Sequence, residues 1–541
     1  MLAKFNKYFF ITIVVIALIP AIPGVLIMLG PIGILCFVLF GFAWFPRFRR
    51  GVFGTVGGIG SGIGAIVTGI FGGFFKIIGW TFKGLFTSIG WLFGLGGSSA
   101  RFMSIWEKAS ILSSRNKGIL MDGRSARLSE KDSYQSLLIQ GGMGRGKTSV
   151  IVMPNLLMPP ADEPSFVISD TSGEIYQKTS GYLHDRGYRI RALNLIDPKK
   201  SETYNPLAGA LAPQQIADVA KTLIASSHSQ SGGKASDPFW EQAAEKLIRI
   251  LAQCLINQGN PRYCNLANLR HLVTSFDAHV AGPGKLGKID QFVLANTQND
   301  PLTFASYQAF VQGNFKAIQS VLMTADVALD GVATPEIASL TQSNSLDLNE
   351  LRTRKTALYI IVNQTDMELY AFLLNLFYAE LFKSLLKDAR NPGNPVWLFL
   401  DEFGHLSING FEVFATTSRK YKVAFALFLQ SMAQLENKYG RSKAKIIQEA
   451  LGSEIYFPGM ALDTAKELEA RLGSINRTPL RAANELIRMK DNQALLLNSN
   501  RPPVVLKTKP YFKRGDLNRR SKLPQAILPT GHGGMPPLLP L

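Results

Sequence analysis

The stretch that decides the fold is Gly141-Gly142-Met143-Gly144-Arg145-Gly146-Lys147-Thr148. It matches in full the pattern G-x-x-x-x-G-K-[ST], a loop whose backbone N–H groups surround phosphate oxygens. Glycines suit this loop because larger side chains would block the approach of the backbone to the phosphates. We expect all eight residues to bind nucleotide phosphates. Lys147 would supply charge to the β- and γ-phosphates, and Thr148 would offer its hydroxyl to Mg²⁺.

The segments on either side of this P-loop have the structure that the motif requires. Ser136–Gln140 is a short apolar run that predicts a strand, and Thr148–Val152 begins a helix. The positive end of that helix then points at the phosphates. A chance match rarely lies between a buried strand and a helix, so we interpret the loop as a site for ATP with Mg²⁺.

Short apolar runs farther along the chain predict more buried strands. Helical patterns separate them, which favours an α/β fold whose parallel sheet is covered on both faces. The runs are Ser165–Asp170, Tyr188–Leu193, Ala357–Val362, Val396–Asp401 and Ala424–Leu429.

Two carboxylates stand where one of these strands ends. The apolar run Val396–Leu400 leads into Asp401 and Glu402. We expect Asp401 to hold Mg²⁺ through water and Glu402 to orient or deprotonate the attacking water. The alternative is an ordinary strand end with two solvated acids, which the upstream P-loop makes less attractive.

Two further polar residues are candidates for catalysis. Gln430 follows the run Ala424–Leu429, where an amide can contact the γ-phosphate and report hydrolysis to the next helix. Arg419 lies between the acid pair and Gln430, and a guanidinium that reaches a neighbouring subunit's nucleotide would stabilise charge during phosphoryl transfer. Surface positions without a catalytic role are the alternatives for both.

The strand and helix signals divide the soluble part of the chain. We predict a nucleotide-binding domain whose first part is 101–212 and whose second part is 346–502, with an all-α domain at 213–345 inserted between them. In the insertion the strand signals fade and apolar residues repeat at helical spacing. Residues 503–541 are basic and rich in proline, and we predict an extended tail without a core of its own.

Residues 1–50 predict a transmembrane hairpin. No charged side chain occurs from Phe9 to Phe45, a stretch longer than the roughly 20 residues of one span. Basic residues flank both ends, which places both ends in the cytoplasm. A signal peptide is the alternative, but no small-residue cleavage site before a polar segment is found. Residues 51–100 are glycine-rich and apolar, and a second hairpin, a re-entrant segment or an interfacial helix pair all fit them.

Charge and composition narrow the classes of partner. Lys and Arg number 58 and Asp and Glu 39, so the formal net charge is +19. Such an excess favours polyanions, either nucleic acid or an anionic membrane surface. The three cysteines form no C-x-x-C pair and the six histidines no ligand cluster, which argues against a disulfide framework or a zinc site. Magnesium bound with nucleotide is the only metal that we expect.

The sequence resembles the coupling-protein ATPases of conjugation and type IV secretion over nearly its whole length. The resemblance includes the N-terminal apolar region and the P-loop. Its other motifs are Ser169-Asp170-Thr171-Ser172-Gly173-Glu174, Tyr204-Asn205-Pro206-Leu207, Leu400-Asp401-Glu402-Phe403, Leu429-Gln430-Ser431, Gln434-Leu435 and Tyr439-Gly440. Ser172 departs from the family, which usually has Lys in an Asp-x-Lys-Gly-Glu segment, so a role for that lysine does not carry over.

The resemblance implies a RecA-like motor core with an all-α domain, in a ring of six subunits. It implies a multi-pass protein of the bacterial inner membrane whose ATPase domain is cytoplasmic. Such a protein uses ATP to pass a relaxase–DNA complex or effector proteins to a type IV secretion channel, and the basic charge favours DNA. The resemblance also favours Arg419 as the arginine that acts across a subunit boundary and Gln430 as the sensor.

Two other functions remain alternatives. A septal-type translocase of double-stranded DNA would have a winged-helix domain at its C-terminal end, and the residues after Pro502 are too few and too rich in proline for one. A receptor or scaffold that binds nucleotide without turnover would not need the Asp401-Glu402 pair.

Overall fold

A computed structural model describes residues 100–209, 212–230, 238–276, 286–401, 403–475, 477–528 and 534–541. The predicted membrane hairpin at 1–50 lies outside the described residues, as does the glycine-rich segment 51–100 except for Ala100. Within the described ranges, no helix is both long enough and apolar enough to span a membrane.

Nine strands of the described chain form one sheet in the order β11-β10-β7-β1-β6-β5-β2-β4-β3. All neighbours from β7 to β3 are parallel, whereas β10 pairs antiparallel with both β7 and β11. The strands are β1 (Leu137–Gln140), β2 (Ser165–Asp170), β3 (Arg189–Asn194), β4 (Thr356–Ile361), β5 (Val396–Leu400), β6 (Val423–Leu429), β7 (Ser453–Tyr456), β10 (Gln493–Asn498) and β11 (Val504–Lys507). The short strands β8 (Ser474–Ile475) and β9 (Thr478–Pro479) pair separately.

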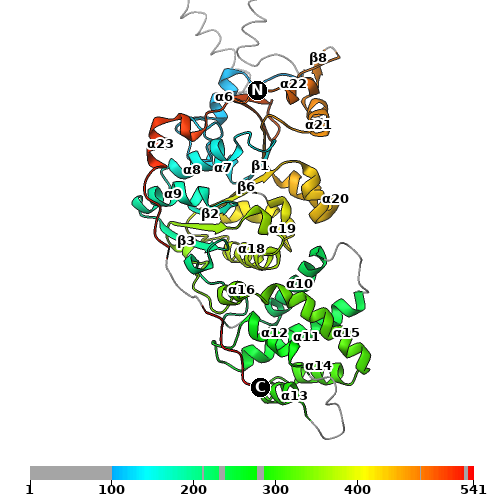
Figure 1. Cartoon of the computed structure of the whole chain (residues 1–541). Coiled ribbons are helices and arrows are strands. Elements are labelled where there is room, and N and C mark those ends of the chain that lie inside the picture. Colours follow the sequence, from blue (N-terminus) through cyan, green and yellow to red (C-terminus); the bar gives the residue numbers. More distant parts are fainter. Residues whose placement is uncertain are drawn as a thin grey trace, which may run out of the picture. The chain divides into compact units, whose positions relative to one another are not determined.

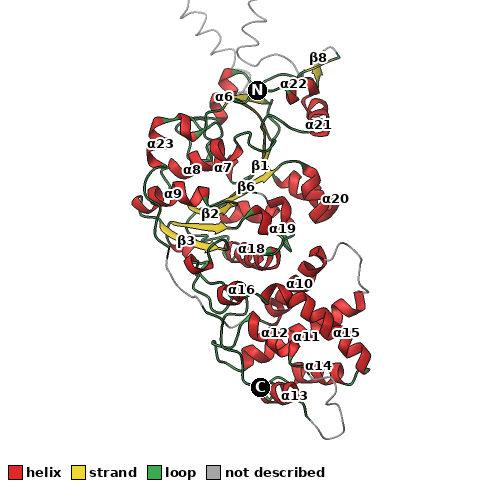
Figure 2. Cartoon of the chain, viewed as in Figure 1, coloured by secondary structure: helices red, strands yellow, loops and turns green. Residues whose placement is uncertain are grey.

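Both faces of the sheet are buried, as the continuous apolar runs predict. Successive side chains of a strand point to opposite faces, and in β1 this sends Leu137 and Ile139 into one apolar cluster and Leu138 into another. Helices lie on both sides of the strands (Figure 2). The sequence-based prediction of a parallel core covered on both faces is therefore confirmed.

Different helices cover the two faces. The cluster around Leu137 includes residues of α8 (Met153–Leu157) and α9 (Glu174–Asp185). The other cluster includes residues of α18 (Ala371–Leu385), α19 (Phe411–Thr417) and α20 (Met432–Ala450). The remaining helices outside the insertion are α6 (Ile105–Ile111), α7 (Glu130–Ser133), α17 (Glu350–Thr353), α21 (Leu462–Leu472), α22 (Ala483–Ile487) and α23 (Gly515–Arg520).

A run of helices occupies the chain between β3 and β4 and gathers in one group (Figure 1). These helices are α10 (Pro213–Gln230), α11 (Pro238–Asn257), α12 (Leu266–Thr274), α13 (Lys288–Asn296), α14 (Pro301–Val311), α15 (Phe315–Leu329) and α16 (Pro335–Leu340). Apolar residues of α11 such as Leu247, Leu251 and Leu255 are fully buried. Their helical spacing is the pattern from which the insertion was predicted.

The prediction of an extended tail from residue 503 onward is wrong for its first part. Val504–Lys507 form the edge strand β11, and α23 follows after a short turn. Val504 and Leu506 are 5% and 1% exposed because alternate residues of the strand face the core. The prolines just before Val504 obscured this strand, yet proline is compatible with the start of an edge strand because no ladder hydrogen bond is lost there.

Candidate functional site

The ends of three neighbouring strands bring the candidate residues to one edge of the sheet. β6 lies between β1, which leads into the P-loop, and β5, which leads into Asp401. Gln140 pairs with Leu429, and Leu400 with Leu427. All three strands are parallel, so their carboxyl ends meet at this edge, where open α/β sheets bind ligands.

The P-loop is held against the rest of the sheet edge by its own backbone. The N–H of Gly142 donates to the carbonyl of Pro458 at 3.2 Å. Gly144 and Gly146 have φ of +68° and +90°, conformations that favour glycine. The ammonium of Lys147 donates to the carbonyls of Gly141 and Gly142 at 2.7 and 3.2 Å, which places its charge inside the loop.

Thr148 and Asp401 meet directly. The Thr148 hydroxyl donates to Asp401 Oδ2 at 3.0 Å, although the two residues are 253 positions apart in sequence. Both line a cavity of about 240 Å³ together with Asp170 and Glu174. A hydroxyl and a carboxylate oxygen beside a loop of backbone N–H groups are the donors that magnesium with a triphosphate needs. The residues present therefore fit a nucleotide with Mg²⁺.

The helix behind the P-loop begins in an unusual register. Thr148–Val152 form a π-helical turn in which the N–H of Met153 donates to the carbonyl of Thr148. Pro154 follows in α8, and a proline there has no N–H to give to the residue four positions earlier. The wider turn accommodates this missing donor, and such turns are frequent at functional sites.

Asp170 lies in the site, although its motif in the sequence predicted no role for it. It ends β2, is 1% exposed and accepts the N–H groups of Tyr176 at 2.7 Å and Ser172 at 3.3 Å. Burial raises the pKa of this carboxyl, and the backbone donors act in the opposite direction. It thereby shapes the turn that carries Glu174 to the cavity. An apolar strand that ends in a carboxylate next to β5 was the available signal.

Tyr511 also lines the cavity, and the sequence offered no signal for it. It comes from the stretch predicted as a tail and is 6% exposed. Its hydroxyl accepts from the ammonium of Lys178 at 3.0 Å, and Lys178 is paired with Glu174. A residue more than 300 positions from the P-loop thus supports the rim of the same cavity.

The remaining predicted residues, apart from Arg419, fall into three groups. Gln430 directly follows β6, and its N–H donates to Gln434 Oε1 at 2.8 Å, so it stands at the same edge as the P-loop. Met143 and Arg145 lie on the outer side of the loop, with Met143 66% exposed and Arg145 paired with Asp491 at 2.9 Å. Glu402 lies outside the described residues.

Arg419 is not brought to the P-loop of its own chain. It is exposed and precedes β6, so it stands at the amino edge of the parallel strands. There it lines a separate cavity of about 470 Å³ with Glu454 and Arg471. The length of β6 separates Arg419 from Gln430, so the arginine and the P-loop lie at opposite ends of this strand.

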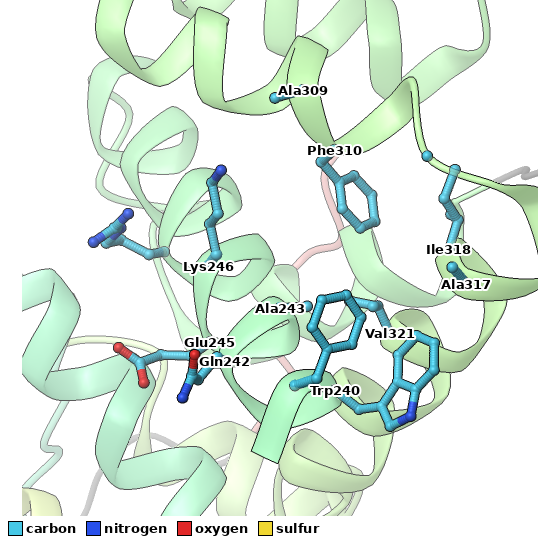
Figure 3. A pocket seen from close by; sticks show the side chains of 13 residues that line it. Trp240, Gln242, Ala243, Glu245, Lys246, Ala309, Phe310, Ala317, Ile318 and Val321 are labelled. Atoms are coloured by element: carbon cyan, nitrogen blue, oxygen red, sulfur yellow. The ribbon is translucent and has the colours of Figure 1, made fainter. Parts of the chain in front are cut away.

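A larger cavity, of about 600 Å³, lies among the inserted helices. Figure 3 shows Trp240, Phe310 and Val321 pointing into it, with Lys246 at one side. Its lining is mainly apolar and lacks a nucleophile paired with a base. Among the described residues, no cluster of three or more His, Cys, Asp or Glu side chains could hold a metal. The chemically equipped site of the described chain is therefore the P-loop edge.

Known proteins share this architecture. Residues 106–481 match the family model of type IV secretory system conjugative DNA transfer proteins. Protein VirD4 of Rhizobium radiobacter is 23% identical over 416 residues, which are 71% of this chain and 58% of VirD4. The coupling protein VirD4 of Bartonella quintana is 21% identical over 431 residues, 72% of this chain and 65% of that protein. The chain thus spans less than two thirds of the length of these relatives.

Solved structures agree on the fold. The bacterial conjugative coupling protein TrwB in complex with sulphate has a TM-score of 0.57 at 17% identity, covering 76% of this chain and 96% of that one. TrwB with a non-hydrolysable ATP analogue has a TM-score of 0.58 at 17% identity, with the same coverage. The mostly parallel sheet and these neighbours identify the core as RecA-like. Because the family model spans most of the sequence, the chain belongs to the type IV secretory system conjugative DNA transfer family.

Proposed function

We propose that this protein is a membrane-anchored coupling ATPase that delivers cargo to a type IV secretion channel. The observation that carries the proposal is the hydrogen bond between Thr148 and Asp401 beside the P-loop, at the rim of a common cavity. TrwB structures are described with ADP and Mg²⁺ and with non-hydrolysable analogues of ATP and GTP. Their fold, shared by this chain, supports ATP with Mg²⁺ as its ligands.

Each residue of the site has a separate task in this proposal. The P-loop backbone and Lys147 bind the β- and γ-phosphates, and Thr148 with Asp401 orients the magnesium ligands. Bound Mg²⁺ neutralises charge on the phosphates during their transfer. Glu402 accepts a proton from the attacking water, and Gln430 senses the γ-phosphate from the adjacent strand.

The position of Arg419 supports a homohexameric ring. This arginine stands at the edge of the sheet that is opposite the P-loop, so its own nucleotide is out of reach. In a ring that places this amino edge beside the nucleotide of the next subunit, Arg419 would stabilise charge there.

Charge and sequence support the proposed cargo and membrane anchor. A net charge of +19 favours a relaxase bound to single-stranded DNA as cargo, with effector proteins as the alternative. The apolar stretch Phe9–Phe45 supports an anchor in the bacterial inner membrane, with the ATPase domain in the cytoplasm. In this proposal the partners are the channel components, the cargo and five further copies of the chain.

The decisive experiment measures ATP turnover by the detergent-purified protein. Lys147→Ala is expected to lose ATP binding and turnover, because its ammonium is the charge that the carbonyls of Gly141 and Gly142 hold inside the loop. Glu402→Gln is expected to bind ATP and not hydrolyse it. Lys131→Ala, an exposed lysine on α7, is the matched control and keeps wild-type turnover. Wild-type protein that binds ATP but shows no turnover even with DNA present would refute the motor and favour a nucleotide-binding scaffold.

A further inference from the structure

The segment 534–541 lies against the inserted helices, beside α12 and α13, where the C mark stands in Figure 1. Its sequence is Gly-Met-Pro-Pro-Leu-Leu-Pro-Leu, without a charged residue. It forms neither helix nor strand. The segment belongs to the predicted extended tail, and its Leu539 is 4% exposed and packs in the larger apolar cluster of the described chain.

A buried side-chain amide of α12 forms hydrogen bonds with the backbone of this segment. Asn268 is fully buried, and its Nδ2 donates to the carbonyl of Pro537 at 3.1 Å. Its Oδ1 accepts the N–H of Leu539 at 2.7 Å. One side chain thus satisfies both a donor and an acceptor of an extended backbone, much as a neighbouring strand would.

A second polar group and two apolar contacts complete the binding. The ring Nε2 of His271, one turn along α12, lies 3.2 Å from the carbonyl of Leu539. Pro536 and Leu539 are buried, whereas Leu538 is 51% exposed. A spacing of three residues between buried positions fits an extended, proline-rich chain, which loses little entropy on binding because it is already ordered.

The stretch before this segment is bound to a different part of the fold, the helix α9. The N–H of Ala526 donates to Ser180 Oγ of α9 at 3.1 Å, and the hydroxyl of Tyr176 donates to the carbonyl of Ala526. Leu528 is 7% exposed in the cluster on the α8–α9 face of the sheet. The chain is therefore anchored on the nucleotide-binding core up to Leu528 and on the inserted helices from residue 536.

We propose that the surface formed by Asn268 and His271 of α12 is a peptide-binding site, occupied within this chain by segment 534–541. Its ligand class is an extended, uncharged peptide in which prolines flank one buried leucine. Through its contacts with α12 and those of the preceding stretch with α9, this part of the chain links the inserted helices to the nucleotide-binding core.

The test uses a fluorescent synthetic peptide of residues 534–541 and the full chain shortened after Leu528. The peptide is expected to bind the shortened chain, and its Leu539→Ala version to bind about tenfold more weakly, because the buried side chain loses apolar contact. The Leu538→Ala peptide is the matched control, with affinity within about twofold of the original since this leucine is exposed. The intact chain is expected to bind the peptide about tenfold or more weakly, since its own segment competes at high effective concentration.

Two results would overturn the proposal. One is equal binding of the peptide by intact and shortened chains, and the other is equal weakening by the two leucine substitutions. If the shortened chain does not fold, hydrogen exchange on the intact chain decides the question. Exchange of the residue 539 amide should accelerate in Leu539→Ala and not in Leu538→Ala. Unchanged exchange in Leu539→Ala would refute the docking.

Discussion

Asn155 is a fully buried amide just behind the P-loop helix start. Its Oδ1 accepts the N–H of Leu120 at 2.8 Å, and its Nδ2 donates to the carbonyls of Leu120 and Ile151 at 2.9 and 2.8 Å. These bonds join α8 to the segment before β1. The helix that positions Thr148 is therefore held by a polar contact inside an otherwise apolar core.

We expect Asn155→Leu to destabilise the fold by about 2–4 kcal/mol, because the N–H and carbonyl of Leu120 would be left buried without partners. Urea denaturation followed by circular dichroism measures this change. Asn116→Ala is a suitable comparison, since Asn116 is only partly buried and its amide bonds backbone carbonyls. A loss of stability in Asn155→Leu no larger than in Asn116→Ala would contradict the expectation.

The Thr148 hydroxyl provides a second prediction for a single residue. Thr148→Val keeps the shape of the side chain and removes the oxygen that bonds Asp401. We expect ATP to bind this variant with the same affinity in Mg²⁺ and in a chelator, whereas the wild type gains affinity from Mg²⁺. Calorimetric titration in both buffers measures the difference, and Thr148→Ser should behave like the wild type. A full magnesium effect in Thr148→Val would exclude this threonine as a ligand.

A single glycine, Gly440, divides the helix α20 into two halves. Gly440 has φ +75° and ψ 155°, a conformation that is essentially restricted to glycine. Before it, the hydroxyl of Tyr439 accepts the N–H of Ile408 at 3.0 Å, close to the stretch that follows Asp401. After it, Arg441 and Lys445 are exposed. The break thus separates a half that begins beside Gln430 from a half that carries exposed positive charge.

Gly440→Ala is expected to cost about 1–3 kcal/mol of stability through backbone strain alone. No atom from outside its own stretch of helix lies within 4 Å of an added Cβ at this position, so a steric clash with the rest of the protein does not contribute. Thermal unfolding measures the effect, with the exposed neighbour Ser442→Ala as control. An unchanged melting temperature in Gly440→Ala would show that the break in the helix is not maintained in solution.

At the scale of the whole molecule, Arg419 and the P-loop lie at opposite edges of one sheet, and in the proposed ring a second copy supplies the arginine. Arg419→Ala alone is expected to lose ATP turnover. Mixing it with Lys147→Ala should restore part of the activity, since one variant supplies an intact P-loop and the other an intact arginine. Turnover of the mixture against the mixing ratio is the measurement. Mixed oligomers without any recovery would place Arg419 outside the reaction.

The net charge of the molecule leads to a prediction about cargo. If phosphates of DNA bind to this basic protein, affinity should fall about 10³-fold or more between about 50 mM and about 200 mM salt. Fluorescence anisotropy of labelled single-stranded DNA with the protein in detergent measures this dependence. Affinity that stays flat across this range would remove DNA as the cargo and leave effector proteins.

Local sequence determined the candidate site and most of the sheet. The P-loop pattern, the acids after β5 and the apolar runs are short-range signals, because a phosphate loop and a buried strand each require certain residue types in consecutive order. The carboxyl-edge positions of Lys147, Asp401 and Gln430 followed from parallel pairing alone.

Tertiary structure decided what depends on distant residues. The sequence did not indicate that Tyr511 supports the nucleotide cavity, that β11 extends the sheet, or that Leu539 docks on Asn268. Two of these contacts join segments separated by hundreds of residues, whereas β11 pairs with β10, its neighbour in the sequence. Each contact forms where the shapes and polar groups of the two partners match. No periodicity within either partner encodes such a match, so it becomes visible only when the folded chain brings both partners together.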